Sequence, residues 1–239
     1  MNTGNYFLDS LPLSVMQRMA FQLETVRLAK GRHLYRQGDT VDSIYFPLSA
    51  VVSQYGTSED GRTIELVLMG REGAVGLAST FNLCAAMQCC QVTISGTAMK
   101  IRTEFVVQIV RHEPELKAAV IRSLNDRLRH MSRRVLCNRY HSVEQRLCTW
   151  MLMVSERCGR PSIRITHIDA ARALGVHRPT ITDAMSILCN QGIIGQSTGR
   201  IEIVDEHAVR KLACECAANL SLTTAEDTSR SFRVQALRN

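Results

Sequence analysis

The spacing of hydrophobic residues changes near residue 103, and this change constrains the fold more than any other feature of the chain. Between Val26 and Arg102, short runs rich in β-branched residues alternate with closely spaced turn signals. Such runs predict a small antiparallel β-roll, or jelly roll. After residue 103 turn signals become rare and apolar residues recur at three- and four-residue steps, which predicts helices. The strand candidates are residues 43–46, 50–53, 63–68 and 92–95. The predicted fold class is therefore α+β.

Helices are expected on both sides of the predicted roll. Apolar residues at helical spacing in residues 8–24 predict one short amphipathic helix before it. After it, Pro114 can begin a long helix that ends near Asn138 and is about 35 Å long at about 1.5 Å per residue. Ser142, with Gln145 three residues later, can begin the next helix through a capping box. A hinge is expected at residues 138–142.

The long helix carries a narrow apolar stripe. Its members, alternately three and four residues apart, are Ile121, Leu124, Leu128, Met131 and Val135. This spacing is typical of a coiled-coil seam, so a symmetric dimer is expected. The alternative is that the stripe packs on the roll of its own chain. Five arginines lie off the stripe and are expected to face solvent: Arg122, Arg127, Arg129, Arg133 and Arg134.

Residues 166–188 have the pattern of a helix-turn-helix. Thr166 with Asp169 can cap the first helix, and Ala171 is small enough for a second helix to cross closely. Gly175 can adopt the left-handed conformation of the turn, and Ile181 supplies a buried contact from the second helix. Because packing dictates the separation of these three positions, the pattern predicts a DNA-binding motif.

The sequence after this motif predicts a wing. Residues 192–204 form a natural hairpin around residues 197–199, and Arg200 at its tip is a candidate phosphate contact. The net charge of +7 arises mostly after residue 103, where 20 Lys and Arg face 14 Asp and Glu. A local basic excess favours a polyanion through counterion release, so duplex DNA is the predicted partner rather than a membrane surface.

These motifs together resemble the cyclic-AMP receptor protein and fumarate-nitrate reduction regulator (Crp/Fnr) family of bacterial transcription factors. The resemblance rests on residues 30–39, 43–46 and 70–73, on the long helix, and on the helix-turn-helix with its wing at residues 199–203. It implies a homodimer with a cyclic-nucleotide-binding-like sensor roll and winged helices that bind a palindromic operator. It also implies contact with RNA polymerase.

The resemblance suggests four segments and a set of DNA contacts. The segments are a sensor domain (1–113), a connector helix (114–140), a winged helix-turn-helix domain (141–221) and a flexible tail (222–239). The candidate DNA contacts are Thr166, His177, Arg178, Thr180, Thr182, Asp183 and Arg200. Arg178 and Thr180 match the family motif, whereas Pro179 and Asp183 replace its glutamate and later arginine. Guanidinium and carboxylate groups read guanine and cytosine, so the operator is expected to differ from the usual one.

The predicted sensor is not expected to bind cyclic AMP tightly. Candidate pocket residues are Glu72, Gly73, Gln88 and Cys89. No Lys or Arg occurs between Gly73 and Met99, so a buried cyclic phosphate would lack a compensating cation and tight cAMP binding is disfavoured. The first cysteine is Cys84, so an N-terminal iron–sulfur cluster is disfavoured too. No cofactor is predicted.

The nine cysteines form no paired C-x-x-C pattern, so no metal site and no disulfide framework is expected. A regulator of the same fold that responds to oxidation of Cys89 and Cys90 is one alternative, and a dimeric scaffold for RNA or a protein partner is another. The predicted roll contains only His33 as a histidine ligand, so an enzyme is not expected. Without an export signal or an 18-residue apolar run, the expected location is the cytoplasm.

Overall fold

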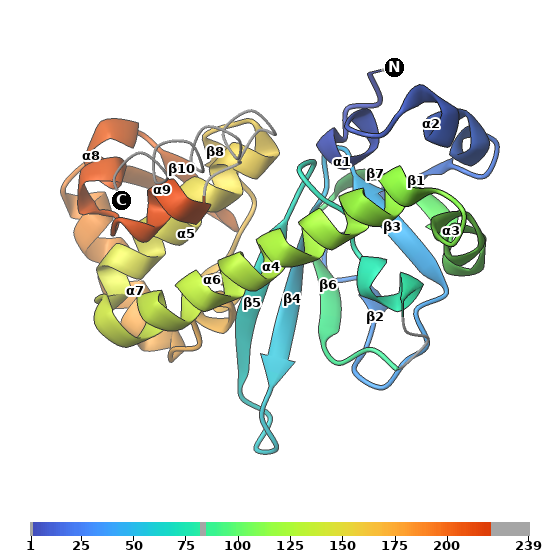
Figure 1. Ribbon diagram of the computed structural model, residues 1–239. Helices are drawn as coiled ribbons and strands as arrows, with labels where there is room; N and C mark the ends of the chain where they lie inside the picture. Colours follow the sequence, from blue (N-terminus) through green and yellow to red (C-terminus); the bar gives the residue numbers. More distant parts are fainter. Residues whose placement is uncertain (1, 82–84, 221–239) are drawn as a thin grey trace, which may run out of the picture.

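The computed structural model describes residues 2–81 and 85–220, and it consists of two lobes joined by one long helix (Figure 1). This helix, α4 (Pro114–Tyr140), runs from the β-rich lobe to the helical lobe. It begins at the predicted proline and ends two residues beyond the predicted end. Among the described residues, no helix combines the length and hydropathy needed to cross a membrane. The predicted tail at 222–239 lies outside the described residues.

The first lobe is the predicted antiparallel β-roll. One sheet has the strand order β2-β6-β4-β5 and the other β1-β7-β3, and all of the pairings are antiparallel. The strands are β1 (Glu24–Leu28), β2 (His33–Tyr35), β3 (Ser43–Pro47), β4 (Val51–Thr57), β5 (Thr63–Met69), β6 (Cys89–Ile94) and β7 (Gly96–Arg102). A 3₁₀ turn, η1 (Leu77–Thr80), follows β5.

Helices flank the roll, but the single helix predicted for residues 8–24 is wrong. Two short helices, α1 (Tyr6–Asp9) and α2 (Leu13–Ala20), occupy this stretch, and β1 begins at Glu24. Pro12 separates them because its ring removes an N–H and restricts the residue before it to extended conformations. After the roll, α3 (Thr103–Val110) leads into α4.

The second lobe is built around α5 (Val143–Cys158). The predicted capping box is confirmed, since the Ser142 hydroxyl accepts from the Gln145 N–H while the Gln145 side chain accepts from the Ser142 N–H. Trp150 on α5 is fully buried in the core of this lobe. The surrounding elements are β8 (Ser162–Ile163), α6 (His167–Leu174), α7 (Arg178–Asn190), β9 (Ile194–Ser197), β10 (Arg200–Ile203), α8 (Glu206–Leu212) and α9 (Cys216–Leu220).

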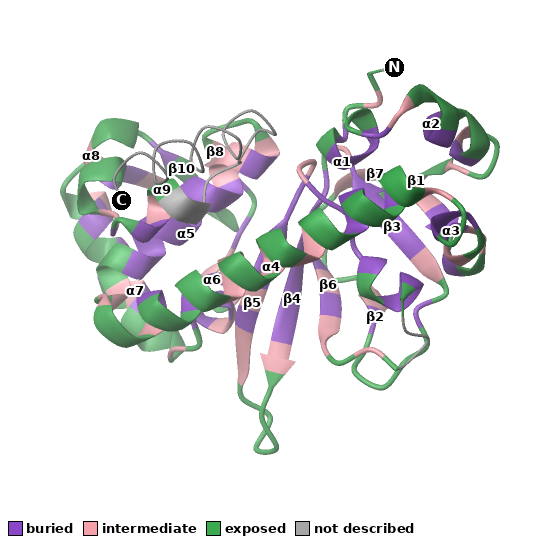
Figure 2. Cartoon of the chain, viewed as in Figure 1, coloured by how far each residue is buried: buried purple, intermediate pink, exposed green. Residues whose placement is uncertain are grey.

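The apolar stripe of α4 is divided between solvent and the chain's own core. Ile121, Leu128 and Val135 are exposed, and Figure 2 shows exposed residues along the length of α4. Leu124 and Met131 are half-buried against the cores of the first lobe. The stripe therefore packs partly on its own roll and leaves a row of seven-residue spacing uncovered.

Two of the arginines expected to face solvent point inward instead. Arg127 donates to the Ala74 carbonyl, and Arg134 is buried, where it donates to the carbonyls of Glu65 (3.3 Å) and Ala173 (3.0 Å). The solvent-facing prediction holds for Arg122, Arg129 and Arg133 and is wrong for these two. For Arg134 the reason is a buried carboxylate on the roll that needs a cation.

That carboxylate belongs to Glu65 on β5, which is 1% exposed. The Ser53 hydroxyl donates to its Oε2 (2.6 Å), the Trp150 Nε1–H donates to its Oε1 (3.1 Å), and Arg134 Nη2 lies 3.8 Å from Oε1. Burial raises the pKa of Glu65, while Arg134 lowers it. Three segments, one from each part of the molecule, thus meet at one side chain.

Arg134→Met should lower the free energy of unfolding by about 3–5 kcal/mol at pH 8, because it leaves a buried carboxylate without its cation. Since burial already raises the pKa of Glu65, protonation relieves part of this penalty, and the loss should shrink as the pH falls toward 5. Urea unfolding can be followed by fluorescence of Trp150, the only tryptophan. Arg133→Met, at an exposed position, should change stability by less than about 0.5 kcal/mol. Equal losses in both variants would contradict this account.

Candidate nucleic-acid interface

The helix-turn-helix predicted from residues 166–188 is confirmed in its local geometry. Thr166 caps α6 in a capping box with Asp169, whose N–H donates to the Thr166 hydroxyl at 3.2 Å. Gly175 ends α6 in the left-handed region (φ 64°, ψ 38°), where a Cβ would be strained. Ala171 and Ile181 are buried between the two helices. The turn therefore fixes α7 against α6.

Helix α7 presents a polar side that no other residue of the described parts, 2–81 and 85–220, covers. Pro179 lies in its first turn, where the missing N–H costs little. The predicted contact residues His177, Arg178, Thr180 and Asp183 are all exposed. The start of α7 thus offers hydrogen-bond donors on side chains of different lengths, from the Thr180 hydroxyl to the Arg178 guanidinium, and one carboxylate, that of Asp183. In a helix-turn-helix this part of the second helix reaches the base edges.

Thr182 is placed differently from the other predicted contacts. Its side chain is half-buried, and its hydroxyl lies 3.0 Å from His167 Nδ1 and donates to the Arg178 carbonyl at 3.2 Å. The other ring nitrogen of His167 lies 3.1 Å from Gln196 Nε2 on β9. The His167 ring thus joins α6, α7 and the wing.

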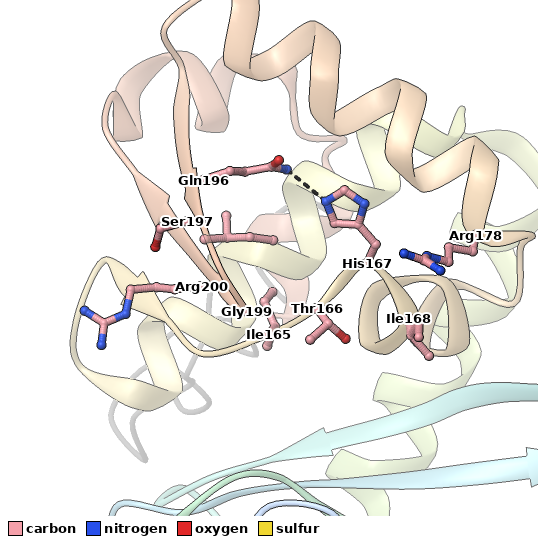
Figure 3. A pocket seen from close by; sticks show the side chains of 10 residues that line it. Ile165, Thr166, His167, Ile168, Arg178, Gln196, Ser197, Gly199 and Arg200 are labelled. Atoms are coloured by element: carbon pink, nitrogen blue, oxygen red, sulfur yellow. Dashed lines mark hydrogen bonds between the residues drawn. The ribbon is translucent and has the colours of Figure 1, made fainter.

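A groove of about 320 Å³ lies between the start of α6, the start of α7 and the wing (Figure 3). Arg178 lines one side and Arg200 the other, and Thr166 lies at its floor together with the N-terminus of α6. The two guanidinium groups give the groove a positive potential, whereas the Asp169 carboxylate of the capping box offsets the dipole of the α6 terminus. A groove of this kind favours a phosphate group.

The sequence analysis missed His167 and Gln196, which line this groove together with Ser197. The sequence could have identified them through their positions next to features that it did predict. His167 directly follows the Thr166 cap, and the other two belong to the first strand of the predicted wing. That wing is confirmed as the β9–β10 hairpin, with Gly199 at φ 69° in its turn.

Two family models match the chain in the order of its two lobes: a cyclic nucleotide-binding domain over residues 25–112 and a Crp-like helix-turn-helix domain over residues 145–212. A CRP-like cAMP-activated global transcriptional regulator of Mycobacterium tuberculosis is 22% identical over 207 residues, covering 84% of this chain and 92% of the relative. The transcriptional regulator SdrP of Thermus thermophilus is 24% identical over 178 residues, covering 72% of this chain and 84% of SdrP. A Crp/Fnr regulator structure from Eubacterium rectale has a TM-score of 0.69 at 18% identity, covering 85% of this chain and 95% of that one.

The chain belongs to the Crp/Fnr family. It is a transcriptional regulator with a Crp-like DNA-binding helix-turn-helix domain, and, as predicted, it is not an enzyme. The predicted fold class, with its roll, long helix and winged helix-turn-helix, is confirmed.

In this Crp/Fnr protein, the candidate effector residues lie at two places along the roll. Glu72 and Gly73 follow β5, and the Glu72 carboxylate accepts from Arg157 Nε (2.7 Å) on α5 and from the Gly70 N–H (3.0 Å). Gln88 and Cys89 lie at the start of β6. The carboxylate of this candidate pocket residue is therefore held by the second lobe.

The paired thiols of this Crp/Fnr roll occupy unlike environments. Cys90 is fully buried, and burial raises the pKa of its thiol to about 12. Cys89 is half-buried, and burial raises its pKa as well. As neighbours on β6 they point to opposite faces of the sheet. Neither environment favours the thiolate that oxidation chemistry requires.

Proposed function

We propose that this regulator acts as a homodimer that binds a palindromic duplex operator, one half-site per α7. The polar first turns of α7 and the adjacent groove are exposed among the described residues, and this observation carries the proposal. With α7 in the major groove, Arg200 and the α6 terminus would meet the flanking phosphates. The family resemblance extends the proposal to contact with RNA polymerase, which in vitro transcription from a promoter carrying the operator would test.

The side chains of α7 suggest what it reads. The Arg178 guanidinium can donate two hydrogen bonds to guanine O6 and N7, and the Asp183 carboxylate can accept from cytosine N4. The Thr180 hydroxyl can form a hydrogen bond to a base edge, and its methyl group can contact a thymine methyl group. Thr182 would contribute less directly, because its hydroxyl is already engaged by His167 and the backbone.

Selection of bound sequences from a random duplex pool should return a palindrome whose half-sites are about one helical turn apart. On that duplex at about 0.15 M salt, Arg178→Ala should weaken binding about 5- to 150-fold and relax the preference at one base pair of each half-site. Arg210→Ala is the matched control, since it removes the same charge from α8, outside the groove. Equal losses in both variants, or a selection without a palindrome, would reject α7 as the reading helix.

The exposed row of α4 supports the dimer. Ile121, Leu128 and Val135 recur every seven residues, and their exposed fractions are 43%, 64% and 68%. Leu136 and Tyr140 extend the apolar surface toward the end of the helix. A second copy of α4 packed along this row would bury it in the manner of a coiled coil.

Leu128→Lys should convert the dimer to a monomer, because it places a charge at the centre of the proposed seam. A loss of about 2 kcal/mol or more is typical of a central interface position and corresponds to at least about 30-fold weaker association. Leu13→Lys on α2 is the control, because Leu13 is 61% exposed and lies off α4. Analytical ultracentrifugation should find a dimer for the unmodified chain and for the control. A monomeric unmodified chain would overturn the proposal.

We also propose that the roll does not bind cAMP tightly. Residues 74–98 contain no Lys or Arg that could pair with a cyclic phosphate, and Arg127, which α4 directs toward the roll, already donates to the Ala74 carbonyl. Any ligand that used the Glu72 carboxylate would have to compete with Arg157. The redox alternative through Cys89 and Cys90 is disfavoured by their opposed faces and raised pKa values.

Calorimetric titration with cAMP should give no saturable heat, whereas the cAMP-activated mycobacterial relative should give it under the same conditions. A missing cation for a buried phosphate costs several kcal/mol, equivalent to an affinity at least about 100-fold weaker. Saturable binding at micromolar cAMP, with a matching rise in the melting temperature, would contradict this prediction.

A further inference from the structure

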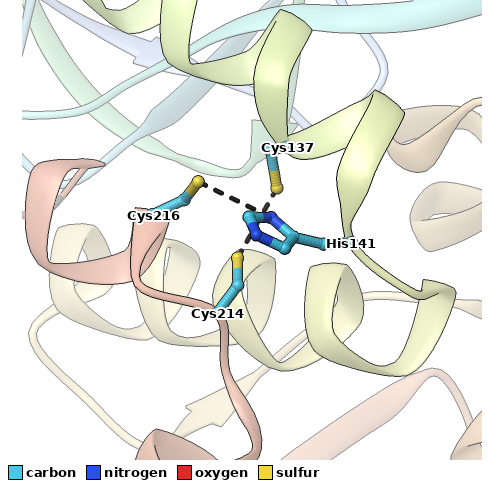
Figure 4. A group of neighbouring side chains, drawn as sticks. All are labelled: Cys137, His141, Cys214 and Cys216. Carbon is cyan, nitrogen blue, oxygen red and sulfur yellow. Dashed lines mark hydrogen bonds between the residues drawn. The ribbon is translucent and has the colours of Figure 1, made fainter.

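Three sulfurs and an imidazole converge where α4 meets the end of the winged helix-turn-helix lobe (Figure 4). Cys137 lies in the last turn of α4, and His141 is the C-cap residue of that helix, with its backbone N–H donating to the Cys137 carbonyl at 3.2 Å. Cys214 lies between α8 and α9, and Cys216 is the first residue of α9. The four ligand atoms all lie within 4.8 Å of one another, and the three cysteines are buried.

Two of the ligand–ligand separations match those of a tetrahedral thiolate site, and the others are within 4.8 Å. Cys137 Sγ lies 3.6 Å from Cys214 Sγ, and Cys216 Sγ lies 3.7 Å from His141 Nδ1. A zinc ion with Zn–S bonds of about 2.3 Å and a Zn–N bond of about 2.0 Å requires ligand–ligand edges of about 3.5–3.8 Å. Three sulfurs and one imidazole nitrogen are a soft donor set that favours Zn²⁺ over Mg²⁺ or Ca²⁺.

The neighbours of the cluster are those that a metal site needs. His141 Nε2 lies 3.1 Å from Glu215 Oε1, so a proton on Nε2 leaves Nδ1 as the nitrogen that faces the sulfurs. The Thr149 hydroxyl lies 3.1 Å from Cys214 Sγ and accepts from the Cys214 N–H at 3.2 Å, which holds that ligand in place. Arg146 interacts electrostatically with Cys137 and Cys214 and can offset the net negative charge of a zinc–Cys₃His centre.

We propose that Cys137, His141, Cys214 and Cys216 bind one structural Zn²⁺ per chain. All four positions of the tetrahedron would be filled by protein, which is the pattern of a structural rather than a catalytic zinc. The ion would tie the end of α4 to the segment after α8, across the break at Ser142. Where the proposed function holds, it would thereby set the angle between the dimer seam on α4 and the reading helix α7.

The test uses the full chain, purified under anaerobic reducing conditions, with zinc measured by mass spectrometry and Co²⁺ as a spectroscopic probe. The unmodified chain should hold about one Zn²⁺. With Co²⁺ it should show the visible bands of a tetrahedral ion and a sulfur-to-cobalt charge-transfer band in the near ultraviolet. Cys158→Ser, which changes a half-buried thiol outside the cluster, should keep both signals.

Cys216→Ser and His141→Ala should each weaken Co²⁺ binding at least about 100-fold and remove the charge-transfer band or reduce it. Glu215→Ala should weaken it by only about 10-fold, because loss of an outer partner of a ligand typically costs about 10- to 100-fold. Far-ultraviolet circular dichroism of each variant separates loss of a metal ligand from loss of the fold. Glu215 is exposed, so the smaller effect expected for Glu215→Ala cannot come from disturbing a buried side chain.

A reduced, folded chain that binds neither Zn²⁺ nor Co²⁺ would overturn the proposal, as would metal content that is unchanged in the ligand variants. A Cys137–Cys214 disulfide in a chain that binds no metal when reduced would also overturn it. Binding of the selected duplex is then compared before and after metal removal by a chelator. Failure of both forms to bind DNA would refute the proposed function and leave the metal site standing.

Discussion

The structure depends on satisfying one carboxylate that the fold places out of contact with water. Glu65 on the roll can stay buried only with hydrogen bonds and a cation, and Ser53, Trp150 and Arg134 supply them. Because these partners come from β4, α5 and α4, the carboxylate fixes the connector helix and the helical lobe against the roll at the same time. Docking of the two lobes is thus a condition for burying Glu65.

Val51, Leu68 and Ile94 of the roll share an apolar core with α5, and further polar contacts join the lobes. Arg172 on α6 donates to Gln91 on β6 and lies over the Tyr55 ring, 4.3 Å from its centroid. Lys30 contacts Asp169, which is itself part of the α6 capping box. The first helix of the DNA-binding motif is therefore held by residues of β4 and β6. A change in the roll at these strands would reach α7 through one rigid turn, at Gly175.

Prediction from sequence succeeded where the determining interactions are local. Pro179, Gly175, the Ser142 capping box and the wing turn are set by residues within a few positions, so caps and turn chemistry identify them. It failed where partners are distant in the chain. Arg134 bonds to Glu65, 69 residues away, and Cys137 meets Cys214, 77 residues away. Periodicity correctly placed Arg134 off the apolar stripe, but it could not show that a buried carboxylate lies on that side of the helix.

The seven-residue spacing along α4 explains how one helix can pack on the roll and also leave an apolar row for a second chain. The end of the same helix contributes to the cysteine–histidine cluster. Arg127 and Arg134 lie one residue before Leu128 and Val135, and one residue of an α-helix is a rotation of about 100°. The row that faces the roll is therefore about a quarter turn from the apolar row left exposed. His141, the C-cap residue that directly follows α4, meets the cysteines of the helical lobe. A second chain can pack along the outer row without breaking any contact that holds the reading helix, because the two rows share no side chain.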